Sequence, residues 1–197
     1  MNKQTILTAI LIFLAINLYS QVNNEAITKL LYQHASDDGP GMAVGIMQDG
    51  EITYEGFVGY ANLEHEVKID KDTRFNIASN AKQFTALCVL KLIHEGKVKL
   101  QDDIRDYLPE LYPTIADKIT ISQIISHTSG VRDISYLWGL KGQTWWKMFV
   151  DNGDAMDLIR SQRDLNCQPG SEYIYSNSNY ILLTEVVQKV TGQDFSD

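Results

Sequence analysis

A serine and a lysine three positions apart, Ser79 and Lys82, are the residues of this chain that most directly suggest a chemistry. On a helix, residues at i and i+3 lie on one face with Cβ atoms about 5–6 Å apart, so the lysine amine can reach the serine hydroxyl. A neutral amine in that position can take the hydroxyl proton while the serine oxygen attacks a carbonyl carbon. The pair therefore predicts nucleophilic acyl transfer.

A phenol and an amide follow far along the chain, in the run Tyr175-Ser176-Asn177. Neither pattern is specific by itself, because a chain of this length is expected to contain S-x-x-K about once by chance. Tyr60-Ala61-Asn62 also fits Tyr-x-Asn. The order of the motifs and the segments around them carry the prediction.

The helix that follows the serine is expected to be enclosed. Residues 84–93 (FTALCVLKLI) are apolar around nearly the whole helical circumference, which is typical of a helix surrounded by other elements. Gly96 is a natural C-terminal stop. A dry environment favours the neutral form of a lysine, which is the form that accepts a proton. We therefore expect Lys82 to lie in an enclosed cleft.

Three segments resemble, in this order, the β-lactamase-related serine hydrolase family: residues 75–86 (FNIASNAKQFTA), 125–131 (ISHTSGV) and 175–192 (YSNSNYILLTEVVQKVTG). The family includes class C β-lactamases, D-Ala-D-Ala carboxypeptidases of the penicillin-binding protein type and related esterases. The likeness runs from about Gly41 to the C-terminus. Tyr-Ser-Asn, in place of the Ser-Asp-Asn motif of class A enzymes, is similar to the class C and carboxypeptidase branch. The resemblance implies an α+β fold in which an antiparallel sheet packs with a helical subdomain.

The resemblance also implies roles for four residues. Ser79 would be the acylated nucleophile, with its own N–H as one oxyanion donor, and Lys82 its proton partner. Tyr175 would share the general-base role and pass a proton to the leaving group, and Asn177 would bind the substrate's amide side chain and orient Lys82. Whether Lys82 or Tyr175 removes the first proton stays open, and Tyr175 is the provisional deacylation base. The implied function is an exported serine hydrolase that acts through an acyl-enzyme on a peptide, ester or β-lactam carbonyl, with no cofactor.

One part of the family pattern is not found. A Lys or His followed by Thr or Ser and Gly on a strand should come after Tyr-x-Asn, but residues 189–192 (KVTG) close an apolar helical run and read as a helix C-terminus. Residues 41–62 form an early hairpin, with two extended runs joined at Asp49-Gly50, a favoured two-residue turn. A lone hairpin is marginal in water. We therefore expect an incomplete domain that lacks its C-terminal strands, a fragment that is inactive or poorly folded by itself.

The N-terminus predicts export. Lys3 precedes the apolar residues 6–18, whose length suits the core of a secretory signal peptide and is short for a membrane span. Residues 1–20 would be the signal peptide, residues 21–40 a helical lead-in and residues 41–197 the partial β-lactamase-related domain. The location would be periplasmic or secreted. An uncleaved membrane anchor is the alternative.

Charge and histidine spacing exclude several classes of protein. The formal net charge of −8 disfavours nucleic acid and anionic membrane surfaces as partners. We expect a monomer that binds a small-molecule or peptide substrate. No metal is expected, because His65 and His94 begin sequences like H-E-x-x-H but Ile69 and Val98 stand where the second histidine is needed. The sequence contains no glycine pattern for a nucleotide cofactor.

Other residues admit a second interpretation. The turn at residues 127–130 (HTSG), with Asp133 nearby, invites a Ser-His-Asp triad, but neighbours on one turn seldom face each other as a triad requires, so we favour a structural turn. Cys88, inside the helix that we expect to be buried, and Cys167 are expected to be unpaired. The chain has three tryptophans, Trp138, Trp145 and Trp146. They either line the substrate cleft or cover the helical core.

Two other function classes remain alternatives. In the first, the chain is a non-catalytic binding relative or truncated remnant of the same fold, which keeps the cleft without turnover. In the second, the chain is a membrane-tethered structural protein in which the spacing of Ser79 and Lys82 is accidental.

Overall fold

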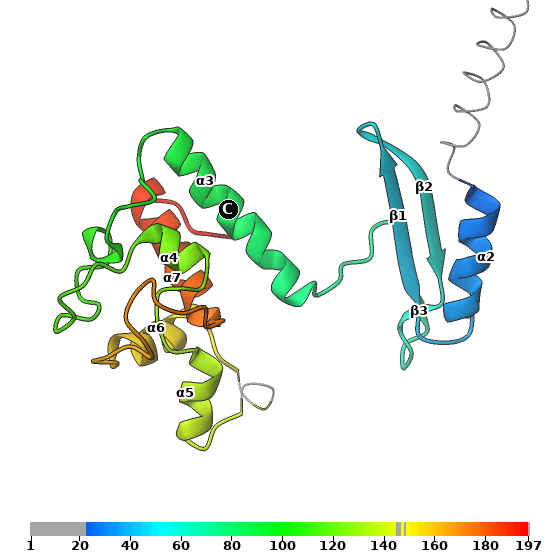
Figure 1. Ribbon diagram of the computed structural model, residues 1–197. Helices are drawn as coiled ribbons and strands as arrows, with labels where there is room; N and C mark the ends of the chain where they lie inside the picture. The colour runs from blue at the N-terminus through cyan, green and yellow to red at the C-terminus, as the bar shows by residue number, and fades with distance from the viewer. Residues whose placement is uncertain (1–22, 145–146, 148, 197) are drawn as a thin grey trace, which may run out of the picture. The chain divides into compact units, whose positions relative to one another are not determined.

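The computed structural model describes residues 23–144, 147 and 149–196 (Figure 1). The predicted signal peptide at residues 1–20 lies outside them, as do Trp145 and Trp146. The chain divides into two compact units, Met1–Asn76 and Ile77–Asp197. Helices and antiparallel strands are both present, so the predicted α+β class is confirmed. Within the described ranges, no helix combines the length and the apolar character needed to cross a bilayer.

The first unit contains the predicted hairpin. Its elements are α2 (Asn24–His34), β1 (Met42–Gln48), β2 (Glu51–Val58), β3 (Tyr60–Asn62) and β4 (Val67–Lys68). β1 pairs antiparallel with β2, and β3 pairs antiparallel with β4. Asp49 and Gly50 have φ values of 51° and 85°. Positive φ at both central residues is what a tight two-residue hairpin turn requires, so this prediction is confirmed.

Helix α2 packs against β2 within this unit. Leu31 and Tyr54 are buried, and the Tyr54 hydroxyl lies 2.9 Å from the hydroxyl of Thr28. The second match to Tyr-x-Asn forms β3 here and so does not belong to the unit that contains Ser79.

The second unit is helical and is organised around α7. Its elements are η1 (Ala78–Ala81), α3 (Lys82–His94), η2 (Ile104–Asp106), α4 (Ile121–Ile125), α5 (Ile134–Leu140), α6 (Asn152–Arg160) and α7 (Asn177–Thr191). Helices α3, α4, α5 and α6 all contact α7. Leu182, Leu183 and Val186 of α7 are 0% exposed and lie in the hydrophobic core. The core therefore fixes the position of the helix whose first residue is Asn177.

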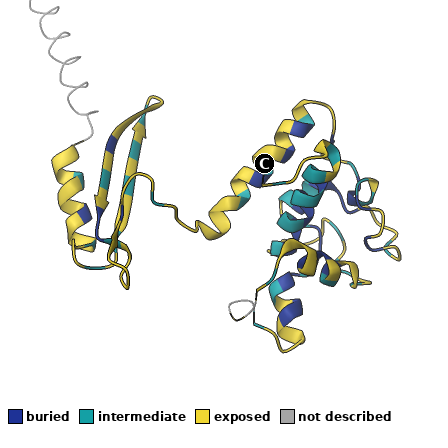
Figure 2. Cartoon of the chain, turned by 180° about the vertical axis from the view of Figure 1, so that it is seen from behind, coloured by how far each residue is buried: buried dark blue, intermediate teal, exposed yellow. Residues whose placement is uncertain are grey.

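Helix α3 is not enclosed, which corrects the sequence prediction. Its buried residues are Thr85, Val89 and Leu92, a single stripe at helical spacing. Leu87 is 62% exposed, and Cys88 is exposed as well, although we expected it inside a buried helix. Figure 2 shows most of α3 in yellow, the colour of exposed residues. The helix is apolar around most of its circumference, as the sequence shows, but among the described residues only one of its faces has neighbours that bury it. Both cysteines are free, as predicted.

The C-terminal end of α7 agrees with the sequence reading. Gly192 has a φ of 72°, and its N–H donates to the carbonyl of Gln188 at 2.8 Å. A left-handed glycine at this position is a common helix stop. Residues 189–192 therefore end a helix and do not form the strand of a third motif.

Candidate active site

A strained turn presents Ser79 at the start of α3. Ala78 has a φ of 47°, a left-handed value that costs a residue with a Cβ about 1–2 kcal/mol. Ser79 follows it in the 3-10 turn η1, where side chains at i and i+3 eclipse. This geometry brings the Lys82 ammonium to within 3.1 Å of Ser79 Oγ, to which it donates a hydrogen bond. The predicted contact between the two residues is present.

Tyr175 and Asn177, from the run Tyr175-Ser176-Asn177, contact the same pair. The Tyr175 hydroxyl lies 2.9 Å from Ser79 Oγ, across a separation of 96 residues. Lys82 Nζ donates to Oδ1 of Asn177 at 2.8 Å, and the Tyr175 hydroxyl donates to the same oxygen at 3.3 Å. All four predicted site residues therefore form one hydrogen-bonded group within the second unit.

The electrostatics of this group favour the phenolate form of Tyr175. Burial alone would raise the pKa of Tyr175, but the Lys82 ammonium and the hydrogen bond with Ser79 outweigh it and lower that pKa below its usual value of 10. Lys82 Nζ lies 5.1 Å from the centre of the Tyr175 ring. A neighbouring cation therefore increases the fraction of Tyr175 that is phenolate near neutral pH, and the phenolate is the form that can accept a proton.

The enclosed cleft expected around Lys82 is not present among the described residues. Ser79 is exposed, Tyr175 is 41% exposed and Lys82 is partly buried. The cause is the open face of α3, whose apolar side chains have no cover over most of the circumference within the part of the chain that the structure describes. A cavity of about 260 Å³ lies beside Lys82 and Asn177, between the start of α3 and α7.

The segment from His127 to Asp133 holds the start of α7, where Asn177 lies. The Asp133 carboxylate accepts the N–H of Ser135, at the start of α5, and the N–H of Asn177, at the start of α7. A negative charge at the N-terminus of a helix is stabilising, and Asp133 serves two helices at once. Asp133 was missed as a supporting residue because the two helix starts are far apart in the sequence.

The triad alternative is not supported by the geometry. Ser129 Oγ donates to Oδ1 of Asn179 at 2.8 Å, and the Asp133 carboxylate is occupied by backbone N–H groups. The backbone carbonyls of His127, Thr128 and Gly130 accept N–H groups from Ile174, Gly170 and Asn166. The turn at residues 127–130 is therefore structural, as we predicted.

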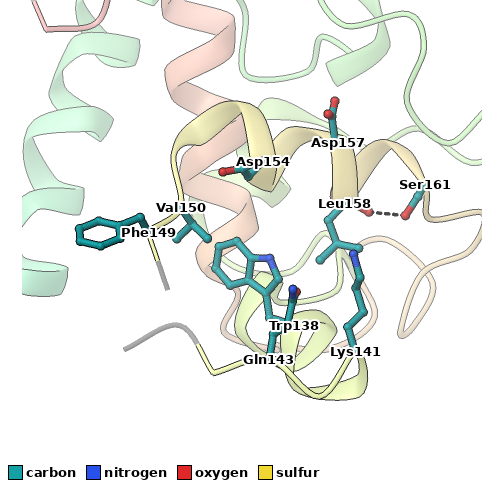
Figure 3. A pocket seen from close by; sticks show the side chains of 9 residues that line it. All are labelled: Trp138, Lys141, Gln143, Phe149, Val150, Asp154, Asp157, Leu158 and Ser161. Carbon is teal, nitrogen blue, oxygen red and sulfur yellow. Dashed lines mark hydrogen bonds between the residues drawn. The ribbon is translucent and has the colours of Figure 1, made fainter. Parts of the chain in front are cut away.

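A second cavity, of about 360 Å³, lies between α5 and α6 and contains none of the predicted site residues (Figure 3). Trp138 lines it beside Val150 and Leu158, and at 8% exposure Trp138 belongs to the hydrophobic core. For this tryptophan the core interpretation holds. In the parts of the chain that the structure describes, no three His, Cys, Asp or Glu side chains are grouped so that they could hold a metal ion.

Comparisons with known proteins find a matching family model and curated relatives. A family model described as Beta-lactamase matches residues 28–197. Protein flp of Staphylococcus aureus (strain N315) is 33% identical over 163 residues, which cover 80% of this chain and 31% of that protein. A D-aminopeptidase of Gluconobacter oxydans (strain 621H) is 32% identical over 159 residues, which cover 81% of this chain and 29% of that protein. The chain thus spans less than a third of the length of these curated relatives.

A solved structure extends the likeness to the fold. The octameric penicillin-binding protein homologue from Pyrococcus abyssi matches with a TM-score of 0.71 and 25% identity, covering 87% of this chain and 39% of that one. The family resemblance seen in the three sequence segments, and the fold it implied, are confirmed.

Proposed function

The chain belongs to the beta-lactamase family, and from that premise we propose that it acts as a serine hydrolase through an acyl-enzyme on Ser79. The observation that carries the proposal is the pair of contacts at Ser79 Oγ, with Lys82 Nζ at 3.1 Å and the Tyr175 oxygen at 2.9 Å. An alcohol between an ammonium donor and a phenolate is arranged to lose its proton to the phenolate oxygen as it attacks, which leaves Tyr175 as a neutral phenol.

We assign the first proton transfer to Tyr175. Lys82 Nζ donates to both Ser79 Oγ and Asn177 Oδ1, so the hydroxyl proton of Ser79 is free to point at the Tyr175 oxygen. The new bond joins Ser79 Oγ to the carbonyl carbon while the proton moves to Tyr175. Tyr175 then returns that proton to the leaving nitrogen or oxygen as its bond to the carbonyl carbon breaks. Water completes the cycle by cleaving the ester on Ser79.

The proposed substrates are carbonyl compounds of the peptide, ester or β-lactam class. The D-aminopeptidase relative supports a peptide bond, since it is 32% identical to this chain. Asn177 is the residue proposed to bind the substrate's amide side chain, next to the Lys82 ammonium.

Labelling of Ser79 tests the proposal. A fluorescent fluorophosphonate and a labelled penicillin are incubated with the chain, and the adduct is located by peptide mass spectrometry. We expect an adduct on Ser79 that Ser79→Ala and Lys82→Ala abolish, while Ser171→Ala, at an exposed serine outside the site, leaves it unchanged. A folded chain that forms no adduct with either probe would favour the binding-only alternative.

We also propose that residues 1–197 by themselves hydrolyse esters and β-lactams poorly, because the Lys/His-Thr/Ser-Gly motif of the family is not among them. With p-nitrophenyl acetate, the expected result is a burst of about one equivalent of p-nitrophenol followed by slow release. Rapid steady-state turnover by these residues would contradict this.

Export is a further part of the proposal, and it rests on Lys3 and the apolar residues 6–18. Expression in a bacterial host should yield a processed chain whose N-terminal residue is Gln21, measured by intact mass. An unprocessed chain in the membrane fraction would support the anchor instead.

A further inference from the structure

One residue holds the backbone on both sides of Tyr175. The N–H of Ile174 donates to the His127 carbonyl at 2.9 Å, and the N–H of Ser176 donates to His127 Nδ1 at 3.2 Å. Tyr175 lies between these two donors. Its position therefore depends on His127 through both neighbouring peptide groups.

The ring of His127 also packs on Tyr175. The two ring centres are 4.5 Å apart and the planes are tilted by 33°. Tyr180 packs against the imidazole at 5.3 Å, and Tyr173 meets it edge-on at 6.0 Å. His127 is only 8% exposed. Its φ of 59° is left-handed, a conformation that the surrounding hydrogen bonds must hold against a cost of about 1–3 kcal/mol.

The hydrogen bonds determine which nitrogen of His127 carries the proton. The N–H of Ser176 is a backbone donor, so Nδ1 must offer a lone pair. The amide of Asn179 then faces Nδ1 with its NH₂ group at 3.3 Å, because its Oδ1 accepts from Ser129 Oγ at 2.8 Å. The neutral imidazole therefore has its proton on Nε2. A proton added at Nδ1 would face two donors and break both bonds.

Charged and titratable groups surround the imidazole from each element packed on it. They are Lys82 from α3, Asp133 before α5, Tyr180 from α7, and Tyr173 and Tyr175 from the segment before α7. Burial lowers the pKa of His127 from 6.5, the Lys82 charge lowers it further, and Asp133 opposes the shift. His127 is therefore neutral at pH 7.

We propose that His127 is a positioning residue for the proposed acyl transfer: in its neutral form it holds the Tyr175 hydroxyl against Ser79 Oγ, and protonation at Nδ1 releases it. The inference rests on the proposed function for its effect on rate. The structural part, the dependence of Tyr175 on the charge of His127, stands on the contacts alone.

The consequence is an acid limit to the reactivity of Ser79. Below the pKa of His127, the fraction of neutral imidazole falls, and the rate of labelling should fall by about a further tenfold per pH unit, beyond the loss that protonation of Tyr175 itself causes. The step measured with a fluorophosphonate joins Ser79 Oγ to phosphorus and expels fluoride, while the hydroxyl proton passes to Tyr175. A Tyr175 that has moved away from Ser79 cannot accept that proton.

His127→Asn is the informative variant. An asparagine oxygen takes the place of Nδ1 as an acceptor for the Ser176 N–H and does not titrate. The expected result is a labelling rate within about tenfold of wild type at pH 8, with the acid limit removed. His127→Leu, which has no acceptor, should label slowly at every pH. His94→Asn is the matched control, because His94 is an exposed histidine at the end of α3 and should keep the wild-type pH profile.

Nuclear magnetic resonance of the wild-type chain tests the structural part without any variant. The imidazole signals of His127 and the ring signals of Tyr175 are followed from pH 8 to pH 4, with circular dichroism to show that the chain stays folded. We expect one shared midpoint below pH 6.5, the usual pKa of histidine. Tyr175 signals that stay constant while His127 titrates would overturn the proposal, as would a His127→Asn variant that retains the acid limit. If Ser79 is not labelled at any pH, the proposed function fails, and the Tyr175 signals alone decide the role of His127.

Discussion

The Lys82 ammonium donates a 2.8 Å hydrogen bond to Oδ1 of Asn177, a residue 95 positions later in the chain. The bond joins the first residue of α3 to the first residue of α7. It leaves the ammonium directed at Ser79 Oγ with its second proton. The orientation of the lysine is thus set by two helix starts that the hydrophobic core holds together.

Asn177→Ala should slow the reaction of Ser79 with a fluorophosphonate by about 10²-fold, because Lys82 loses the acceptor that orients it. The free energy of unfolding should fall by about 1–3 kcal/mol, because Oδ1 of Asn177 accepts hydrogen bonds from both Lys82 and Tyr175. Rates come from the time course of the Ser79 adduct, and stability comes from urea unfolding. A labelling rate within twofold of wild type would show that Asn177 does not orient Lys82.

Tyr175→Phe should slow labelling by about 10²–10⁴-fold while changing stability little. The variant removes the hydroxyl that contacts Ser79 and Asn177 but keeps the ring that packs on His127. Tyr173→Phe is the control, since Tyr173 also packs on His127 but is 68% exposed and lies outside the hydrogen-bonded group. Equal rates for the two variants would count against Tyr175 as the proton acceptor.

Lys82→Ala should raise the pKa of Tyr175. With the ammonium present this pKa is below 10, so the phenolate forms at lower pH in the folded chain than in the unfolded chain. A depressed pKa contributes stability that is complete above pH 10 and is lost as the pH falls through the folded value. The measurement is the absorbance difference at about 295 nm between each chain and its Tyr175→Phe counterpart. An unchanged midpoint in Lys82→Ala would exclude the lysine as the cause.

Leu183→Ala and Leu87→Ala compare a core position with the open face of α3. Leu183 is 0% exposed and Leu87 is 62% exposed. The first substitution should lower the free energy of unfolding by about 2–5 kcal/mol, and the second by less than about 0.5 kcal/mol. Urea unfolding measures both. A large loss in Leu87→Ala would mean that the exposed face of α3 is covered in solution.

The sequence determined the local relationships by itself. The spacing of Ser79 and Lys82 sets their contact because one helical turn brings i and i+3 together wherever the helix lies. Asp49-Gly50 and Gly192 predicted a turn and a helix end because both depend on the backbone of one or two residues. The likeness in three segments identified the family, which implied that Tyr175 and Asn177 belong with the serine.

Only the tertiary structure decided what lies around those residues. Apolar composition showed that α3 can be buried, but not which of its faces meets a partner, and so the prediction of an enclosed helix was wrong. The sequence predicted that the turn at residues 127–130 is structural. It did not predict that the N–H groups of both neighbours of Tyr175 donate to His127, because these residues are far apart in the chain and no local pattern connects them. Contacts between distant segments follow from how the core packs, and packing depends on all of its residues at once.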